Sequence, residues 1–164
     1  WPRLLPEGKG RINQDGISFY DKLIDGMLER ELKPFGTLYH WDLPINFSEK
    51  GGWVNRDTSN YFADYTDLVM KKFGDRLYSI ATINEPWCAS WLSYYCGEHA
   101  PGLKDLSAAA KSMHFIPKIA RSCSFKSAFL KGTWFMIYGK STFAGRHSGR
   151  GPQIVTILHP CFKL

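Results

Sequence analysis

The feature that most constrains the fold is an alternation of helical and strand-like patterns in the first half of the chain. Apolar residues recur with a helical period from Asn13, the expected N-cap, to Leu32. Pro34 is expected to end this helix, and a short β-prone run follows at residues 35–41. A second helical pattern covers residues 58–73, and a buried-strand pattern covers residues 77–83. This order is typical of βα units and predicts an α/β fold with a parallel sheet.

Glycine and apolar residues mark the remaining elements. Gly74 follows the second helical pattern, where a left-handed residue at the helix end is expected. A third helix is predicted over residues 106–113. Beyond it no clear period recurs, and residues 154–158 are the one further strand prediction, as an isolated strand.

The charge is distributed unevenly along the chain. Residues 1–105 hold 12 Lys and Arg and all 15 Asp and Glu, whereas residues 106–164 hold nine basic residues and no acid. One interpretation of this basic tail is a nucleic-acid-binding segment. The other is out-of-frame translation, which we favour because ordinary domains seldom lose every acidic residue while keeping many aromatic and apolar ones.

Several classes of protein are disfavoured by the composition. No run approaches the ~18 apolar residues of a membrane span, so no membrane association is expected. The four cysteines lack the spacing of a metal site, and we interpret them as free thiols of a cytoplasmic protein. Because the chain begins with Trp1 rather than Met, we expect a fragment of a longer protein.

A set of short motifs occurs in a fixed order along residues 1–114. They are Trp1-Pro2-Arg3, Thr37-Leu38-Tyr39-His40-Trp41-Asp42-Leu43-Pro44, Gly51-Gly52-Trp53, Phe73-Gly74-Asp75-Arg76, Thr82-Ile83-Asn84-Glu85-Pro86-Trp87 and Gly97-Glu98-His99-Ala100-Pro101-Gly102. Asn-Glu-Pro alone is a weak signal, but the ordered set is specific. In this set the chain resembles glycoside hydrolase family 1, of the β-glucosidase type, up to about His114.

The resemblance implies a fold and a division of the chain. The expected fold is a partial (β/α)₈ TIM barrel holding about strands two to four of eight, with its active site at the C-terminal ends of the strands. Residues 1–114 would be the partial catalytic domain, and residues 115–164 an unassigned basic tail. Three strands without barrel closure would leave parallel edges exposed, so we expect poor folding or aggregation of the chain alone.

The resemblance also implies site residues. Glu85 would be the general acid/base of a retaining β-glycosidase that hydrolyses terminal β-D-glucosyl residues by double displacement. Asn84 would bind the 2-hydroxyl of the sugar, and His40 and Trp41 would line the same subsite. The expected partner is a small β-glycoside or oligosaccharide, without nucleic acid, and no cofactor or metal is implied.

The chemistry of a proton-donating glutamate sets two further requirements. A carboxylic acid donates a proton at neutral pH only when burial or a nearby negative charge raises its pKa, and a strand end inside a cleft would supply burial. The nucleophile of the family lies in a Thr-Glu-Asn-Gly-type motif, which this sequence lacks. We therefore expect this chain to be inactive alone. The alternative hypothesis is a non-catalytic sugar-binding remnant or pseudoenzyme.

Neighbouring residues receive structural interpretations. Trp53 is interpreted as a structural anchor, and Asp42 as a residue that holds its loop through hydrogen bonds. An aromatic cluster is expected beside the site, formed by Trp87, Trp91, Tyr94 and Tyr95.

Overall fold

The core of the fold is a four-stranded parallel sheet. The computed structural model describes residues 1–116, 134–136 and 154–156. The strand order is β3-β2-β1-β4, and every pairing is parallel. The strands are β1 (Lys33–Tyr39), β2 (Ser79–Ile83), β3 (Trp134–Met136) and β4 (Ile154–Thr156). The parallel α/β arrangement expected from the alternating patterns is therefore confirmed.

The two outer strands come from the segment after residue 116. β4 pairs with residues 33–35 of β1, and β3 pairs with residues 79–81 of β2. The prediction of an isolated strand at residues 154–158 was therefore wrong, because its first three residues extend the sheet. Each outer edge of the β1–β2 pair is covered over three residues. These edges are therefore less exposed than was expected for three barrel strands without closure.

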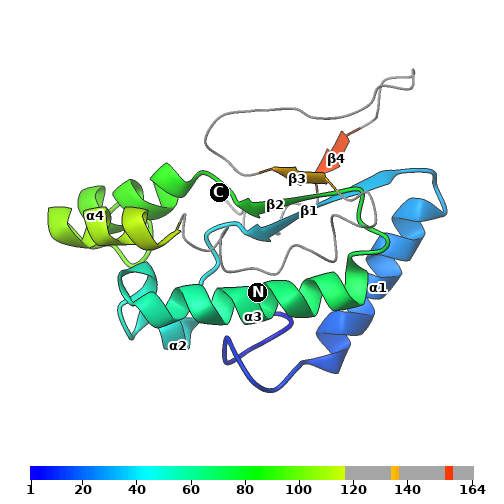
Figure 1. The fold of residues 1–164 in the computed structure, drawn as a ribbon, viewed down its shortest axis with the longest axis horizontal. Coiled ribbons are helices and arrows are strands. Elements are labelled where there is room, and N and C mark those ends of the chain that lie inside the picture. The colour runs from blue at the N-terminus through cyan, green and yellow to red at the C-terminus, as the bar shows by residue number, and fades with distance from the viewer. Residues whose placement is uncertain (117–133, 137–153, 157–164) are drawn as a thin grey trace.

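Two long helices cover one face of the sheet. Figure 1 shows α1 (Gln14–Leu28) and α3 (Arg56–Phe73) on the same side of β1 and β2. The strands point toward the end of the molecule that holds a π-helix, η2 (Cys88–Cys96), and α4 (Leu106–Phe115), which contact each other. The short α2 (Ile45–Ser48) and the 3₁₀ helix η1 (Gly52–Val54) connect β1 to α3.

The N-terminus of α1 agrees with the sequence prediction, whereas its C-terminus does not. The Asn13 side chain accepts a hydrogen bond from the backbone N–H of Asp15, so the predicted N-cap is confirmed. The helix ends at Leu28, well before Pro34, which lies inside β1. Glu31 adopts a left-handed φ of 58° and donates its N–H to the Leu28 carbonyl, while the next N–H bonds to the Met27 carbonyl. This is a Schellman C-cap in which glutamate takes the position usually held by glycine.

Gly74 ends α3 for a different reason from the one predicted. Its φ is −62°, so it is not left-handed as the sequence suggested. A Cβ atom at this position would lie 2.6 Å from the Met70 carbonyl oxygen. Glycine is therefore required by close approach to the preceding turn, and the left-handed residue occurs at the end of α1 instead.

Aromatic side chains dominate the core between the sheet and α3. Trp53 is 1% exposed, and its ring centroid lies 5.0 Å from Tyr39 and 5.8 Å from Phe62. Trp1 stacks on Tyr65 with centroids 5.3 Å apart. The interpretation of Trp53 as a structural anchor is confirmed, since its ring is enclosed by aromatic rings from β1 and α3.

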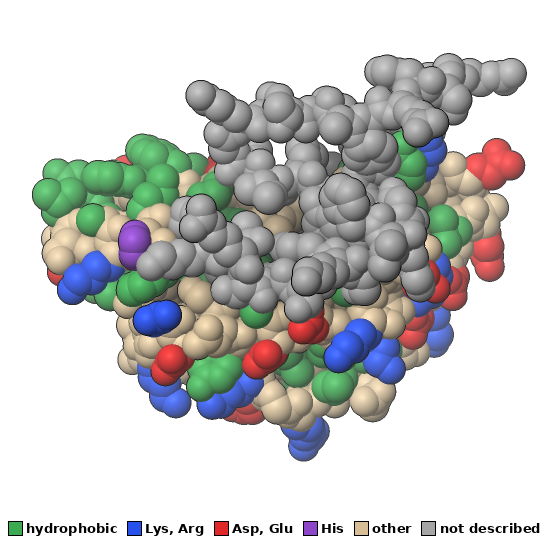
Figure 2. Space-filling model, in the orientation of Figure 1, with side chains coloured by type: hydrophobic (Ala, Val, Ile, Leu, Met, Phe, Trp, Pro, Cys, Tyr) green, Lys and Arg blue, Asp and Glu red, His purple; other side chains and the backbone are tan. Residues whose placement is uncertain are grey.

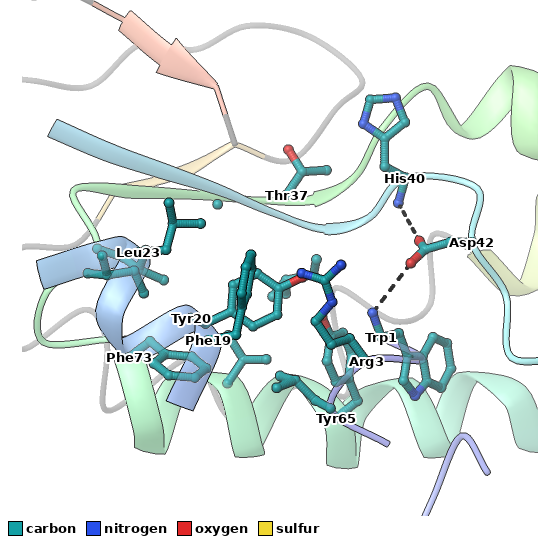
Figure 3. A pocket seen from close by; sticks show the side chains of 16 residues that line it. Trp1, Arg3, Phe19, Tyr20, Leu23, Thr37, His40, Asp42, Tyr65 and Phe73 are labelled. Carbon is teal, nitrogen blue, oxygen red and sulfur yellow. Dashed lines mark hydrogen bonds and ion pairs between the residues drawn. The ribbon is translucent and has the colours of Figure 1, made fainter. Parts of the chain in front are cut away.

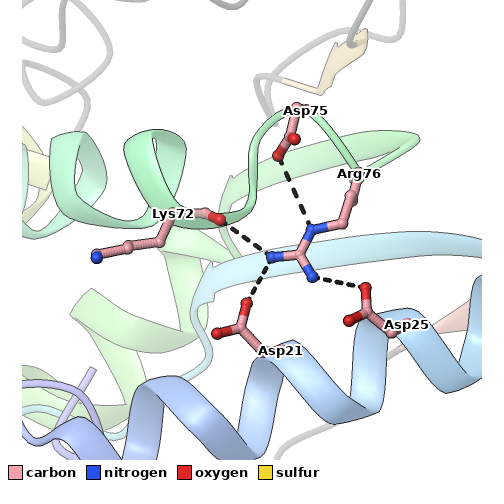
Figure 4. A network of polar contacts seen from close by, with 5 residues as sticks. All are labelled: Asp21, Asp25, Lys72, Asp75 and Arg76. Atoms are coloured by element: carbon pink, nitrogen blue, oxygen red, sulfur yellow. Dashed lines mark hydrogen bonds and ion pairs between the residues drawn. The ribbon is translucent and has the colours of Figure 1, made fainter.

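Arg76 links α1 to the end of α3. Its guanidinium donates to Asp21 at 2.5 Å and to Asp25 at 2.6 Å, and it also donates to the Lys72 carbonyl oxygen (Figure 4). The hydrogen bonds to the two aspartates raise the pKa of Arg76 further above its ordinary value. The guanidinium therefore fastens the two helices at the end opposite the strand C-termini.

Replacing Arg76 by Met is expected to lower the free energy of unfolding by about 0.5–1 kcal/mol, because the ion pairs are partly exposed and screened. Urea unfolding of the chain at low salt measures this difference, which should shrink in 1 M salt. Lys71→Met is the control, since Lys71 is exposed in the last turn of α3. An equal loss in both variants would contradict a specific role for Arg76.

Candidate functional site

The predicted site residues lie where two adjacent strands end. Tyr39, the last residue of β1, is in register with Ile83, the last residue of β2. The backbone N–H of Asn84 donates to the Tyr39 carbonyl at 2.9 Å, which continues the pairing one residue further. Because parallel strands end at the same edge of a sheet, residues 40–41 and 84–85 leave the sheet side by side.

Trp41 joins the two strand ends directly. Its indole Nε1 donates to the Asn84 carbonyl oxygen at 3.0 Å. The backbone of Trp41 is left-handed, with φ at 73°, a conformation that is rare for a bulky residue. Such strain persists only where surrounding contacts impose it, and it concentrates at functional sites. The contact therefore fixes how both chain segments leave the sheet.

His99 also contacts this site, although no role is expected for it from sequence. Its ring centroid lies 4.8 Å from that of Trp41, with the planes tilted by 44°. His99 lies in the loop that follows η2, two residues after its C-cap, Gly97. The motif at residues 97–102 marks this loop in the sequence, but spacing alone does not place its histidine against an indole 58 positions earlier.

Glu85 also has a left-handed backbone, with φ at 44°. It directly precedes Pro86, and its carbonyl accepts from the N–H of Ala89 at the start of a helical turn. The Cys88 thiol lies 3.1 Å from Glu85 Oε2 and donates to it. The side chain of Glu85 is exposed. The expectation that a cleft buries this carboxyl group is therefore wrong for the part of the chain that the structure describes.

The thiol partner of Glu85 is itself perturbed. Partial burial, followed by the hydrogen bond to Glu85 and its negative charge, raises the pKa of Cys88 to about 11. Cys88 and Cys96 are both free thiols. Cys88 is therefore protonated at neutral pH and available as a hydrogen-bond donor.

Asp42 organises the loop after β1. Its Oδ1 accepts from the backbone N–H of His40 at 3.4 Å, and its Oδ2 lies 3.5 Å from the amino nitrogen of Trp1. The interpretation that Asp42 holds its loop is confirmed by these contacts.

The expected aromatic cluster divides into two parts. Tyr94 is buried, and its hydroxyl accepts from the Trp53 backbone N–H at 2.8 Å, so it belongs to the core. Trp87 and Tyr95 are 53% and 47% exposed, and Tyr95 contacts Trp91 with centroids 5.4 Å apart. Figure 2 shows hydrophobic side chains gathered on the surface at the end of the molecule where η2 and α4 lie. The prediction of one cluster beside the site was therefore wrong.

A cavity of about 360 Å³ lies between β1 and the helices α1 and α3. Its lining is mainly apolar and aromatic, with Phe19, Tyr20 and Tyr65 on the helix side (Figure 3). His40 contributes to the rim, but its imidazole points away from the cavity, across β1. Trp41, Asn84 and Glu85 do not line it. The cavity is therefore separate from the predicted sugar site.

The described residues hold neither a metal cluster nor a membrane-spanning helix. Among residues 1–116 and the two short strands, no three His, Cys, Asp or Glu side chains gather in the way a metal ion requires. Within the same part of the chain, no helix has the length and hydropathy needed to cross a bilayer.

The sequence profile of glycosyl hydrolase family 1 matches residues 1–128. A β-glucosidase of Agrobacterium sp. (strain ATCC 21400) is 51% identical over 116 residues, which cover 71% of this chain and 25% of that protein. A 1,4-β-D-glucan glucohydrolase of Thermotoga neapolitana is 47% identical over 114 residues, covering 70% of this chain and 27% of that protein. The chain thus spans about a quarter of the length of these relatives.

Solved structures give the same result. A family 1 β-glucosidase from Thermotoga maritima superposes with a TM-score of 0.79 at 40% identity, covering 82% of this chain and 31% of that chain. The β-glucosidase from the same organism in complex with glucoimidazole also superposes with a TM-score of 0.79 at 40% identity. These neighbours are (β/α)₈ barrels, so the chain has the fold of a part of such a barrel.

Proposed function

This chain belongs to glycosyl hydrolase family 1, and from that membership we propose that it carries the acid/base half of a retaining β-glucosidase site. Under this proposal Trp1-Pro2-Arg3 ends the second barrel strand, while β1 and β2 are the third and fourth strands. Catalytic groups of such barrels lie at the C-terminal strand ends. The pairing of Tyr39 with Ile83 supports this assignment, because it puts the two sugar-site motifs at one sheet edge.

The observation that carries the proposal is the pair of left-handed residues at adjacent strand ends, Trp41 and Glu85. Neither residue is a glycine, so each conformation costs about 1–3 kcal/mol and needs support from its surroundings. The indole hydrogen bond to the Asn84 carbonyl supplies such support. A sheet edge that holds a carboxylate and an indole in this way suits a sugar, which presents polar rims and apolar faces.

The reaction needs two carboxyl groups ~5–5.5 Å apart. Glu85 would protonate the leaving glycosidic oxygen and then remove a proton from the incoming water. The second carboxylate would attack the anomeric carbon from a part of the barrel that corresponds to the remaining three quarters of the relatives' length. That part would also enclose Glu85, which is exposed in the present chain, and so provide the burial that a proton donor requires.

The remaining site residues would bind the substrate. Asn84 would hydrogen-bond the sugar 2-hydroxyl, a contact that strengthens in the transition state. His40 would bind a hydroxyl group through its imidazole, and Trp41 would pack beside the ring. The substrate would be a small β-glucoside or β-glucan fragment, in keeping with the names of the relatives, and the double displacement requires no cofactor.

The isolated chain is expected to show no turnover of an aryl β-glucoside, because one carboxylate cannot perform a double displacement. A graft tests the proposal directly: residues 1–114 replace the aligned segment of the Agrobacterium β-glucosidase, which is 51% identical over this region. The graft should hydrolyse the aryl β-glucoside, measured as kcat/KM, and the unaltered relative is the reference.

Two outcomes would contradict the proposal. Turnover by the isolated chain, after purification away from host glycosidases, would show that the second carboxylate is not required from elsewhere. A folded graft that binds gluconolactone but does not hydrolyse the glucoside would favour the alternative function, a non-catalytic sugar-binding remnant.

A further inference from the structure

We infer that Cys88 is a positioning residue for Glu85, holding its carboxylate in one orientation through a thiol hydrogen bond. The distance from Cys88 Sγ to Glu85 Oε2 is 3.1 Å, within the range of a sulfur donor. Within the described residues, no other side chain donates to this carboxylate. The inference deepens the proposed function and rests on it, because positioning matters only if Glu85 transfers the proton.

The backbone explains why these two side chains meet. Glu85 precedes the first helical residue, Pro86, whose fixed φ suits that place. Residues three apart on a helical turn lie on the same face, so Cys88 faces back toward the strand end. The backbone bond from the Ala89 N–H to the Glu85 carbonyl closes this turn at 3.1 Å. The turn therefore places the Cys88 thiol beside the carboxylate of Glu85, a residue whose backbone lies in the left-handed region.

An exposed glutamate side chain otherwise samples several rotamers. A proton donor must keep its carboxyl within hydrogen-bond reach of the leaving oxygen, and small misplacements lower the rate strongly. The Cys88 thiol can hold the carboxylate in place because its raised pKa, about 11, keeps it protonated at neutral pH. A thiol is also uncharged, so it orients the carboxylate without adding a competing ion pair.

Alkylation of the full chain with iodoacetamide at pH 8 tests the contact, with modification at each cysteine measured by peptide mass spectrometry. Thiolate is the reactive form, and each unit of pKa changes its fraction about tenfold. Glu85→Gln removes the charge and should speed alkylation of Cys88 by roughly three- to tenfold. Cys96, a free thiol on the same π-helix, is the internal reference and should not change.

Glu98→Gln is the matched control, since Glu98 is an exposed acid near Cys96 in sequence and has no hydrogen bond to Cys88. An unchanged Cys88 rate in Glu85→Gln would overturn the inference, as would an equal acceleration in Glu98→Gln. If the full chain does not fold, Cys88 and Cys96 react equally fast in all variants, and the same comparison is then made in the graft, which holds Glu85 and both cysteines.

Orientation is tested by replacing the thiol. Cys88→Ser keeps a donor, whereas Cys88→Ala removes it with little change of volume. The ¹³C carboxyl resonance of Glu85, assigned by its loss in Glu85→Gln, should stay near its original position in the serine variant and move in the alanine variant. Equal spectra in both variants would contradict positioning.

A rate measurement separates the failure of this inference from that of the proposed function. In the active graft, Cys88→Ala should lower kcat about tenfold with little change in KM, and Cys88→Ser should restore most of it. If Cys88→Ala leaves kcat unchanged while Glu85→Gln abolishes turnover, the positioning role is wrong and the catalytic role of Glu85 stands.

Discussion

Replacing Glu85 by Gln in the active graft is expected to lower kcat/KM for an aryl β-glucoside by about 10²–10⁴-fold. Glutamine keeps the shape of the side chain but can neither donate a proton to the leaving oxygen nor accept one from water, and general acid–base catalysis contributes about this factor. The loss should be smaller for substrates with activated leaving groups, because these need little protonation. Initial rates with two aryl glucosides of different leaving-group pKa measure both effects.

The control for this prediction is Glu98→Gln, which removes the same charge from an exposed position in the loop after η2. It should leave kcat/KM within about twofold of the unmodified graft. Full activity of the Glu85→Gln graft would exclude Glu85 as the acid/base. The strand ends would then have a role in sugar binding alone.

Replacing Trp53 by Ala is expected to destabilise the chain by about 3–5 kcal/mol, a large share of the stability of a small domain. The indole is 1% exposed and packs against Tyr39 and Phe62, so alanine leaves a large gap that rigid aromatic rings cannot close. The soluble yield and the urea midpoint report the loss.

Trp87→Ala is the matched control, because this tryptophan is 53% exposed at the start of the helical segment after β2. Its removal should change the free energy of unfolding by less than about 0.5 kcal/mol. Similar losses for both tryptophans would show that Trp53 does not anchor the core in solution.

The sequence predicts the elements well where periodicity or a cap residue carries the signal. Asn13 caps α1 as expected, since an amide side chain before an amphipathic run satisfies free N–H groups of the first turn. The helix at residues 106–113 is also confirmed, as α4. Helix C-termini were predicted less well because they depend on local close approach. Glu31 takes the left-handed position that sequence statistics give to glycine, and Gly74 does not.

The position of the candidate site residues at two strand ends follows from the sequence, whereas their backbone conformation does not. Motifs that follow β-prone runs identify the strand ends, and parallel pairing then brings residues 40–41 and 84–85 together. Residue identity does not reveal the left-handed backbone of Trp41 or Glu85, because non-glycine residues adopt it only under tertiary constraint. The π-helix likewise turns Tyr94 into the core and leaves Tyr95 outside, a division that a list of adjacent aromatic residues cannot show.

The hydrogen bond from the Trp41 indole to the Asn84 carbonyl also bears on gene shuffling within the family. The two partners are 43 positions apart in sequence, yet the bond joins the two segments that leave the sheet. A crossover between these positions therefore preserves the contact only when the parent that supplies the first part of the gene carries an indole there. Because the acceptor is a backbone carbonyl, any residue at position 84 can accept this bond, and only the residue at position 41 decides whether it forms.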